Sequence, residues 1–87
     1  MIELTYIVKA KNGLHARPAG KLSTLAKTFK SEIKIKSKDK EADAKRLLSV
    51  MSLGATCGSE LTFIISGEDE KQASKELSSI FTRLDNE

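Results

Sequence analysis

The sequence contains no tryptophan, one cysteine, one proline and one histidine. The single cysteine, Cys57, cannot form a disulfide within the chain, and we interpret it as a small loop residue without a redox role. One cysteine and one histidine do not provide the ligands of a zinc site. We therefore expect neither a metal nor another cofactor.

Long hydrophobic runs are absent as well. No stretch approaches the ~20 consecutive apolar residues of a membrane-spanning helix, so we expect no membrane insertion. The segment MIELTYIVKA at the start of the sequence includes the acidic Glu3 and lacks the pattern of a signal peptide. Together with the scarcity of cysteine, these absences predict a protein of the reducing cytoplasm.

Neither sign of charge is strongly in excess, because 15 lysine and arginine residues accompany 12 aspartate and glutamate residues, a formal net charge of +3. The alternating lysines from Lys34 to Lys40 predict a solvated strand face. One tyrosine and three phenylalanines, most at positions expected to point inward, do not form the stacking platform of a nucleic-acid binder. A nucleic-acid-binding module is kept as the alternative from another class of function.

The spacing of apolar residues changes several times along the chain, which indicates one mixed domain over residues 1–87. Alternation predicts strands, and spacings of three and four predict helices. Gly54 is expected to end the second helix, and Ser66 with Asp69 to open the last one. The predicted elements are a strand over 2–8, a helix over 16–29, a strand around 33–35, a short strand over 41–44, a helix over 45–53, a strand over 61–65 and a helix from 66 to 84.

The order β-α-β-β-α-β-α has too few strands for a doubly wound parallel fold. It predicts an α+β fold, an open-faced β-sandwich in which a four-stranded antiparallel sheet carries three helices on one face. Each inward strand residue contributes roughly 1.5–3 kcal/mol on full burial, so we expect a core that is stable without a metal or a disulfide.

The segment NGLHARPAG, residues 12–20, contains both the only histidine, His15, and the only proline, Pro18. His15 falls between the first predicted strand and the first predicted helix, at or beside the helix N-cap. Gly13 suits the turn that Asn12 and Gly13 form. Pro18 fits the first helical turn, because its missing N–H has no acceptor inside the helix.

A histidine at this position lies beside the first-turn amides of Ala16 and Arg17, at the positive end of the helix dipole. Such a terminus binds anions, the Arg17 guanidinium can make two parallel bonds to phosphate oxygens, and imidazole is nucleophilic at physiological pH. The pattern indicates a phosphoryl group carried on His15. Direct transfer from ATP is not expected without a glycine-rich phosphate loop or an acidic metal pair. On these residues alone, a histidine that only caps the helix remains the simpler interpretation.

The predicted helix over 45–53 has more apolar residues than one face can bury. Val50 and Leu53 are expected to point inward, which leaves the others exposed near a charged site, as is typical of a transient docking surface. The residues left exposed are Leu47, Leu48 and Met51. A basic rim of Lys27 and Lys45 is expected to steer acidic partners toward this surface.

Three segments, GLHARPAG, LLSVMSLGATCGSELTF and GEDEKQA, together resemble the HPr family over nearly the whole chain. HPr proteins are the histidine-containing phosphocarriers of the bacterial phosphoenolpyruvate:sugar phosphotransferase system. The resemblance implies an open-faced sandwich of four antiparallel strands and three helices. It also implies that enzyme I phosphorylates His15 at Nδ1 and that the group passes to the IIA domains of sugar permeases. The chain is then a carrier rather than a self-sufficient enzyme.

The resemblance also implies roles for the residues around His15. Arg17, with the amide of Ala16, is expected to bind the phosphate, and Asn12 is expected to support the phosphohistidine. From the residues alone, Lys27 is expected to lie at the rim of the docking surface, and Gly20 is expected either to permit close approach of a docked partner or to serve packing only. The exposed docking patch corresponds to Leu47, Leu48 and Met51. We expect a monomer whose partners are enzyme I, IIA domains and further regulatory proteins.

The chain departs from the family at Arg46. Many HPr proteins of low-GC Gram-positive bacteria have a serine there, which an ATP-dependent kinase phosphorylates. Arginine has no hydroxyl to phosphorylate, and its charge is mildly disfavoured at a helix N-terminus. Ser49 and Ser52 are not convincing substitutes, so we expect no regulatory phosphorylation at position 46. A specialised paralogue in a nitrogen-related or dihydroxyacetone-related phosphotransfer or signalling chain remains the alternative within the family.

Overall fold

A computed structural model describes residues 1–84, which form the predicted order β-α-β-β-α-β-α. The elements are β1 (Ile2–Ile7), α1 (Ala16–Ala26), β2 (Glu32–Ser37), β3 (Lys40–Asp43), α2 (Leu47–Met51), β4 (Glu60–Ser66) and α3 (Glu70–Leu84). The strands follow the order β1-β4-β2-β3, and each neighbouring pair is antiparallel. The predicted four-stranded antiparallel sheet is therefore confirmed.

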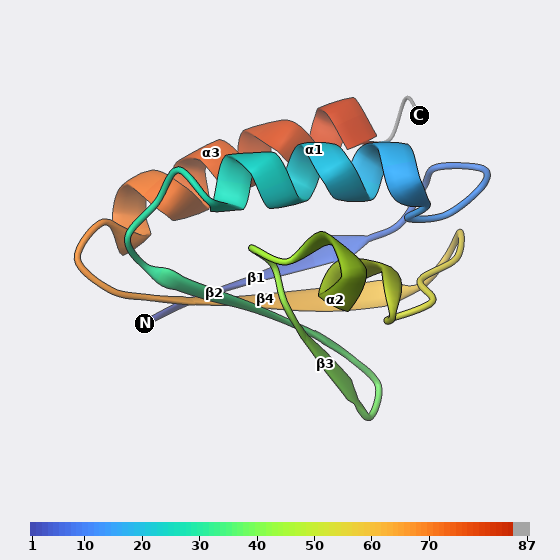
Figure 1. Ribbon diagram of the computed structural model, residues 1–87, viewed down its shortest axis with the longest axis horizontal. Helices are drawn as coiled ribbons and strands as arrows, with labels where there is room; N and C mark the ends of the chain where they lie inside the picture. Colours follow the sequence, from blue (N-terminus) through green and yellow to red (C-terminus); the bar gives the residue numbers. More distant parts are fainter. Residues whose placement is uncertain (85–87) are drawn as a thin grey trace.

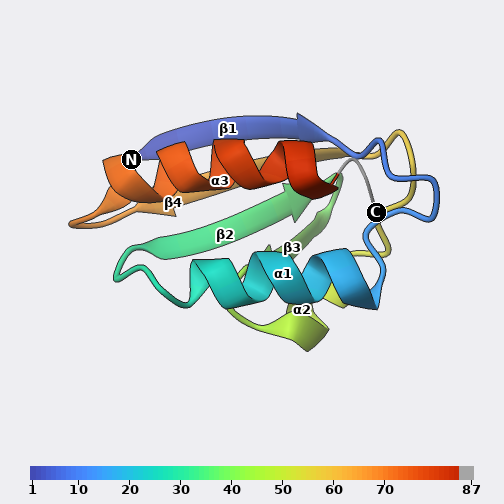
Figure 2. The ribbon, with the colours of Figure 1, turned by 90° about the horizontal axis from the view of Figure 1, so that it is seen from above.

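The helices cover one face of this sheet (Figure 1). α1 and α3 lie side by side and run in opposite directions, whereas the shorter α2 packs beside α1 near β3 (Figures 1 and 2). Within residues 1–84 the opposite face of the sheet carries no helix, which confirms the open-faced α+β sandwich. At one end of the sheet, the loop before α1 lies beside the loop before β4 (Figure 2).

Period-two alternation decides which strand residues enter the core. In β2 and β4 every second side chain is fully buried, namely Ile33, Ile35, Leu61, Phe63 and Ile65. The residues between them in β2 are exposed, and Lys34 pairs with Glu32 at 3.2 Å and with Glu41 at 3.8 Å. Lys34 and Lys36 therefore lie on a solvated strand face, as predicted, whereas Lys38 lies in the turn after β2 and Lys40 begins β3.

The aromatic residues belong to the core rather than to an exposed surface. The rings of Tyr6 and Phe81 stack with centroids 4.5 Å apart, and those of Phe63 and Phe81 meet at 5.0 Å. Phe29 is half-buried against the same core. All the aromatic residues lie within residues 1–84 and none is exposed, so the predicted absence of a stacking platform is confirmed.

α1 is shorter than predicted, because it ends at Ala26 rather than at Phe29. Beyond Ala26 the backbone tightens: the N–H of Thr28 donates to the Leu25 carbonyl at 3.0 Å, and the N–H of Phe29 donates to the Ala26 carbonyl at 3.3 Å. The Thr28 hydroxyl also donates to the Leu25 carbonyl, at 2.7 Å. A carbonyl that a longer helix would use is thereby satisfied, and Phe29 turns toward the core.

α2 begins later and ends earlier than the predicted helix over 45–53. Two hydrogen bonds hold the preceding chain in a loop, since the N–H of Asp43 donates to Ser49 Oγ at 2.9 Å and the N–H of Lys45 donates to Asp43 Oδ1 at 3.0 Å. Arg46 follows with an extended backbone, φ −116° and ψ 115°. These side-chain acceptors compete with helix formation, which apolar spacing does not reveal.

The prediction that Ser66 and Asp69 open the last helix is wrong. Ser66 is the last residue of β4, and α3 begins at Glu70. The side chain that reaches back to the chain before the helix is that of Glu70, whose carboxylate accepts a hydrogen bond from the N–H of Gly67 at 3.0 Å. The sequence predicts this capping role for Asp69. The carboxylate of Asp69 instead faces another segment of the chain.

Asp69 holds the loop between α1 and β2. Its carboxylate accepts hydrogen bonds from the backbone N–H groups of Lys30 at 2.8 Å and Ser31 at 2.9 Å, and from the Ser31 hydroxyl. The Ser31 hydroxyl first, and then the Lys30 amide, lower the pKa of Asp69 from 3.8 to about 2. The carboxylate thus ties residues 30 and 31 to the start of α3.

Replacing Asp69 with asparagine is expected to lower the thermal unfolding midpoint near neutral pH. Because folding lowers the pKa of this carboxyl from 3.8 to about 2, its contribution to stability is complete above pH 3.8 and is lost as the pH falls through 2. The difference in midpoint between the wild type and Asp69→Asn therefore shrinks on acidification. Circular dichroism melts across this range measure it, with the exposed Glu68→Gln as the control. A difference that is equally large at both ends of the range contradicts the prediction.

Candidate functional site

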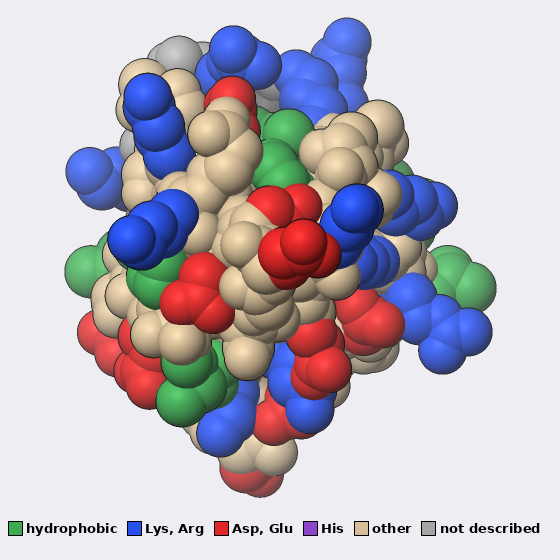
Figure 3. All heavy atoms as spheres, turned by 90° about the vertical axis from the view of Figure 1, so that its left-hand side faces the viewer, with side chains coloured by type: hydrophobic (Ala, Val, Ile, Leu, Met, Phe, Trp, Pro, Cys, Tyr) green, Lys and Arg blue, Asp and Glu red, His purple; other side chains and the backbone are tan. Residues whose placement is uncertain are grey.

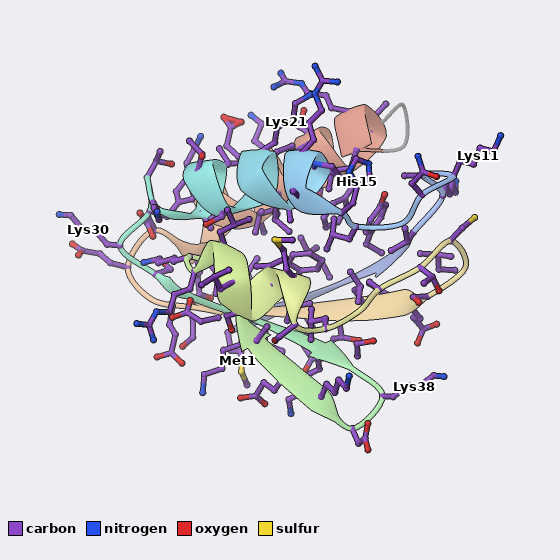
Figure 4. The ribbon with its side chains drawn as sticks, turned by 45° about the vertical axis from the view of Figure 1, so that its right-hand side comes forward. Met1, Lys11, His15, Lys21, Lys30 and Lys38 are labelled. Atoms are coloured by element: carbon purple, nitrogen blue, oxygen red, sulfur yellow. The ribbon has the colours of Figure 1, made fainter. Side chains whose placement is uncertain are left out.

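His15 is the N-cap residue of α1, as the sequence predicts (Figure 4). Its backbone is extended, φ −83° and ψ −171°, and its carbonyl accepts the N–H of Ala19 at 3.0 Å. The imidazole makes no capping hydrogen bond, and the residue is half-buried rather than sealed in the core. The missing capping bond contradicts the alternative in which the ring only caps the helix.

The chain before His15 is held by a tight turn and by a hydrogen bond to another loop. The N–H of Gly13 donates to the carbonyl three residues earlier at 2.9 Å, which closes a turn on which Asn12 is exposed. Leu14 is buried in the core, and its N–H donates to the Ala55 carbonyl at 3.0 Å. His15 therefore follows a residue whose side chain and backbone are both fixed.

Gly13 permits this contact between the two loops. Its φ is +71°, in the left-handed region that disfavours residues with a Cβ. A Cβ at Gly13 would lie 2.5 Å from the Ala55 oxygen and 2.8 Å from the Thr56 Cα. The sequence predicts a turn glycine here. It does not reveal the contact, because the partner lies about forty residues further along the chain.

The loop of residues 54–59 supports both ends of the segment between β1 and His15 (Figure 2). At the far end of that segment, Gly58 N–H donates to the Val8 carbonyl at 2.7 Å and Val8 N–H donates to the Ser59 carbonyl at 2.9 Å. Cys57 is exposed in the same loop, as predicted. Sequence analysis missed this support. The sequence signal for this loop is its two glycines, Gly54 and Gly58.

The first turn of α1 favours an anion beside His15. The amides of Ala16 and Arg17 point out of the helix at its positive end, and both residues are exposed. Pro18 is buried and has no N–H to present. No acidic residue lies in this first turn, so the helix itself does not neutralise its terminus. The structure therefore brings together the predicted phosphate-binding groups of His15, Ala16 and Arg17.

The apolar residues in α2 and just after it fall into a buried and an exposed group, as predicted. Val50 and Leu53 are buried, at 1% and 5% exposure. Leu47, Leu48 and Met51 are exposed, at 38%, 81% and 39% respectively. We call these three residues the apolar patch. Their exposure is the property that a docking surface requires.

A shallow hollow of about 550 Å³ borders the apolar patch where α2 begins beside the end of α1. Its lining consists of Lys27, Lys45, Arg46, Leu47, Leu48 and Ser49. The predicted basic rim of Lys27 and Lys45 thus adjoins apolar residues. Arg46 is a third cation in the same place, although sequence analysis considered it only as the replacement of a serine.

Gly20 does not line this hollow. It lines a separate groove of about 660 Å³ between α1 and α3, together with Lys21 and Arg83. A Cβ at Gly20 would meet no atom within 4 Å, so the surface above it is open. Of the residues predicted to touch partners, the structure gathers Lys27 with the apolar residues and leaves Gly20 on the α3 side of α1.

The fold and the site define a small open-faced α+β domain that presents a histidine at the start of its first helix. Residues 2–83 match the family described as "PTS HPr component phosphorylation site". The chain is 44% identical over 78 residues to the phosphocarrier protein HPr of Buchnera aphidicola. This match covers 90% of this chain and 92% of that protein. The chain therefore belongs to the HPr family of phosphocarriers of the phosphotransferase system.

Solved structures agree with this assignment. An HPr from Thermoanaerobacter tengcongensis has a TM-score of 0.92 at 36% identity, and the match covers 100% of this chain and 98% of that one. An HPr dimer from the same organism has a TM-score of 0.75 at 36% identity, with 95% of each chain covered. Family membership favours the phosphocarrier over the nucleic-acid-binding module. Because a dimer occurs among the related structures, the monomer expected from the sequence stays a prediction.

None of the helices formed by residues 1–84 combines the length and hydrophobicity needed to cross a bilayer. In the same part of the chain, no three histidine, cysteine, aspartate or glutamate side chains gather as a metal-binding group.

Replacing Gly13 with alanine is expected to destabilise the fold more than replacing Gly54. Both glycines have left-handed backbones, with φ of +71° and +62°, so each alanine costs about 1–2 kcal/mol in conformational strain. A new Cβ collides with backbone atoms only at Gly13, since nothing lies within 4 Å of one at Gly54. Urea unfolding of Gly13→Ala and Gly54→Ala measures the difference. Equal losses of stability contradict the proposed contact.

Proposed function

We propose that His15 accepts a phosphoryl group from enzyme I and passes it to the IIA domains of sugar permeases. The observation that carries this proposal is the N-cap position of a half-buried imidazole that makes no capping hydrogen bond. Family membership supports the overall activity, and this geometry supports the choice of residue. The carrier acts in the cytoplasm as a monomer and relies on its partners to complete each transfer.

The chemistry follows from the groups at the start of α1. Nδ1 of the neutral His15 ring attacks the phosphorus atom carried by enzyme I. A P–N bond forms on His15 as the bond from phosphorus to enzyme I breaks, and the bonding electrons remain with the enzyme I group. Transfer to a IIA domain repeats this exchange with His15 as the leaving group. No water enters either step.

Two neighbours of His15 stabilise the phosphorylated form. The first-turn amides of Ala16 and Arg17 face the added negative charge, and the Arg17 guanidinium binds phosphate oxygens. Asn12, exposed on the preceding turn, plays a supporting role. The stabilisation has to be moderate, because a tightly held phosphoryl group is not passed on.

The docking surface for both partners is the apolar patch together with Lys27, and Gly20 permits close approach beside α1. Leu48 is 81% exposed, and burying it in an interface removes that apolar surface from water. Regulatory proteins that recognise the carrier are expected to use the same surface.

Incubation with phosphoenolpyruvate and enzyme I is expected to produce an acid-labile, alkali-stable phosphate on the protein. The label should be absent from His15→Ala and present in Lys11→Ala, a control in the loop before α1. Mass spectrometry under alkaline conditions detects it. Persistent labelling of His15→Ala excludes the proposed site. Salt-dependent RNA binding without any labelling would instead support the nucleic-acid-binding module.

We further propose that the protein is not regulated by phosphorylation at position 46. Arg46 is exposed but has no hydroxyl, and the two nearby serines are engaged in the structure. Ser49 Oγ accepts the N–H of Asp43 at 2.9 Å, and Ser52 Oγ donates to the Ser49 carbonyl at 2.6 Å. Phosphorylation of Ser52 would remove the hydroxyl hydrogen that it donates in this bond.

Treatment with ATP and an HPr kinase is therefore expected to leave the wild type without phosphoserine. The variant Arg46→Ser places a hydroxyl at the N-cap of α2 and serves as the positive control for kinase recognition. Phosphopeptide mapping by mass spectrometry distinguishes the two proteins. Detection of phosphoserine in the wild type contradicts this proposal.

A further inference from the structure

Three cations surround the hollow beside the apolar patch without a matching carboxylate. Lys27, Lys45 and Arg46 line it, and none of its lining residues is acidic. Among residues 1–84, none of these three side chains forms an ion pair with a carboxylate. The nearest acidic residue in the sequence is Asp43, and its Oδ1 accepts the backbone N–H of Lys45. The hollow therefore carries uncompensated positive charge.

Other charged parts of the surface differ from the hollow. On the open face of the sheet, Lys34 lies within reach of Glu32 and Glu41, and Lys36 lies 4.0 Å from Glu41. Where α1 ends and α3 begins, basic and acidic side chains are interspersed over that end of the molecule (Figure 3). The pairing of Lys34 and Lys36 with carboxylates thus distinguishes the cations of the sheet face from those of the hollow.

The three cations differ in how they are held: Lys45 is anchored, whereas Lys27 and Arg46 are both exposed. Lys45 Nζ donates to the Phe29 carbonyl at 2.8 Å, so this ammonium is held against the end of α1. Lys27 follows directly after α1 and is exposed. Arg46 is exposed on an extended backbone immediately before Leu47, and its side chain makes no capping hydrogen bond. Its guanidinium is available to a carboxylate on a docked protein.

We propose that Arg46 is a specificity-determining residue that, with Lys27 and Lys45, receives carboxylates from an acidic surface on the protein that phosphorylates His15. The inference rests on the proposed function and assigns a docking role to the residue that replaces the regulatory serine. Charge complementarity identifies the occupant. An exposed apolar patch bordered by unpaired cations fits an apolar spot bordered by acidic side chains.

A charge at the rim of an interface acts mainly on encounter with the partner rather than on the chemical step. Exposed ion pairs contribute about 0.2–1 kcal/mol, which corresponds to an effect of about 1.4- to 5-fold. Arg46→Ser is therefore expected to raise the KM for the carrier by up to about 5-fold at low salt, with kcat unchanged. Arg46→Glu is expected to raise it further, and Arg46→Lys to restore most of the loss. At about 1 M salt, where screening acts within 3 Å, the variants should converge.

The experiment measures initial rates of carrier phosphorylation by purified enzyme I and phosphoenolpyruvate over a series of salt concentrations. Lys75→Ser is the matched control, because Lys75 is an exposed cation on α3, away from the hollow. The proposal predicts a salt-dependent KM effect at position 46 and none at position 75. Equal KM values for the wild type and Arg46→Ser at low salt, or a difference that salt does not reduce, overturn it.

This outcome is separable from the failure of the proposed function. If His15 is the acceptor, the variants at positions 46 and 75 all become labelled to completion, and only their rates differ. If no protein in the set is labelled, including the wild type, the proposed function fails before position 46 is tested. Loss of RNA binding in Arg46→Ser, with unchanged phosphorylation rates, would identify a nucleic acid as the occupant and contradict the proposal.

Discussion

The contact between the chain at Gly13 and Leu14 and the backbone at Ala55 is the constraint on which the site depends. Leu14 N–H donates to the Ala55 carbonyl, and the absence of a Cβ at Gly13 lets the two backbones approach. This contact fixes the residue immediately before His15, so the start of α1 is determined from outside the helix. In the proposed function His15 has to meet two different partner proteins, and a fixed preceding residue holds it in one position for both.

α1 connects the two surfaces to which the proposed function assigns phosphoryl transfer and docking. Its N-terminal end holds His15 and the outward-pointing amides of the first turn, and its C-terminal end leads to Lys27 at the hollow. Because α2 packs against α1, the apolar patch is attached to the helix that begins beside His15. Chemistry and docking are thus separated along a single helix of 11 residues. A change at the docking end can alter encounter without altering the reacting group.

Much of this arrangement follows from local sequence patterns. Alternation in β2 and β4 predicts the buried strand residues, and the surplus of apolar residues around α2 predicts that Val50 is buried while Leu48 is exposed. The start of α1 at His15 follows from turn and proline chemistry. The resemblance to a known family, rather than periodicity, supplies the partners and the phosphorylated atom.

The features that sequence analysis missed depend on contacts between distant residues. Asp69 was expected to cap its own helix, yet its carboxylate binds amides that lie 38 and 39 residues away. The ends of α1 and α2 depend on side chains that satisfy backbone groups, which spacing does not report. Arg46 was considered for the serine it replaces. Its position among unpaired cations became visible only when Lys27 was placed beside it.

The strand order has a consequence for how the molecule is made. β4 lies between β1 and β2, so neither of these strands has its main neighbour until residues 60–66 have left the ribosome. Most of the sheet therefore assembles only after residues 60–66 have been made and have emerged. Until then, the edges of β1 and β2 that later pair with β4 carry unpaired backbone groups, which are the groups through which nascent chains associate with one another.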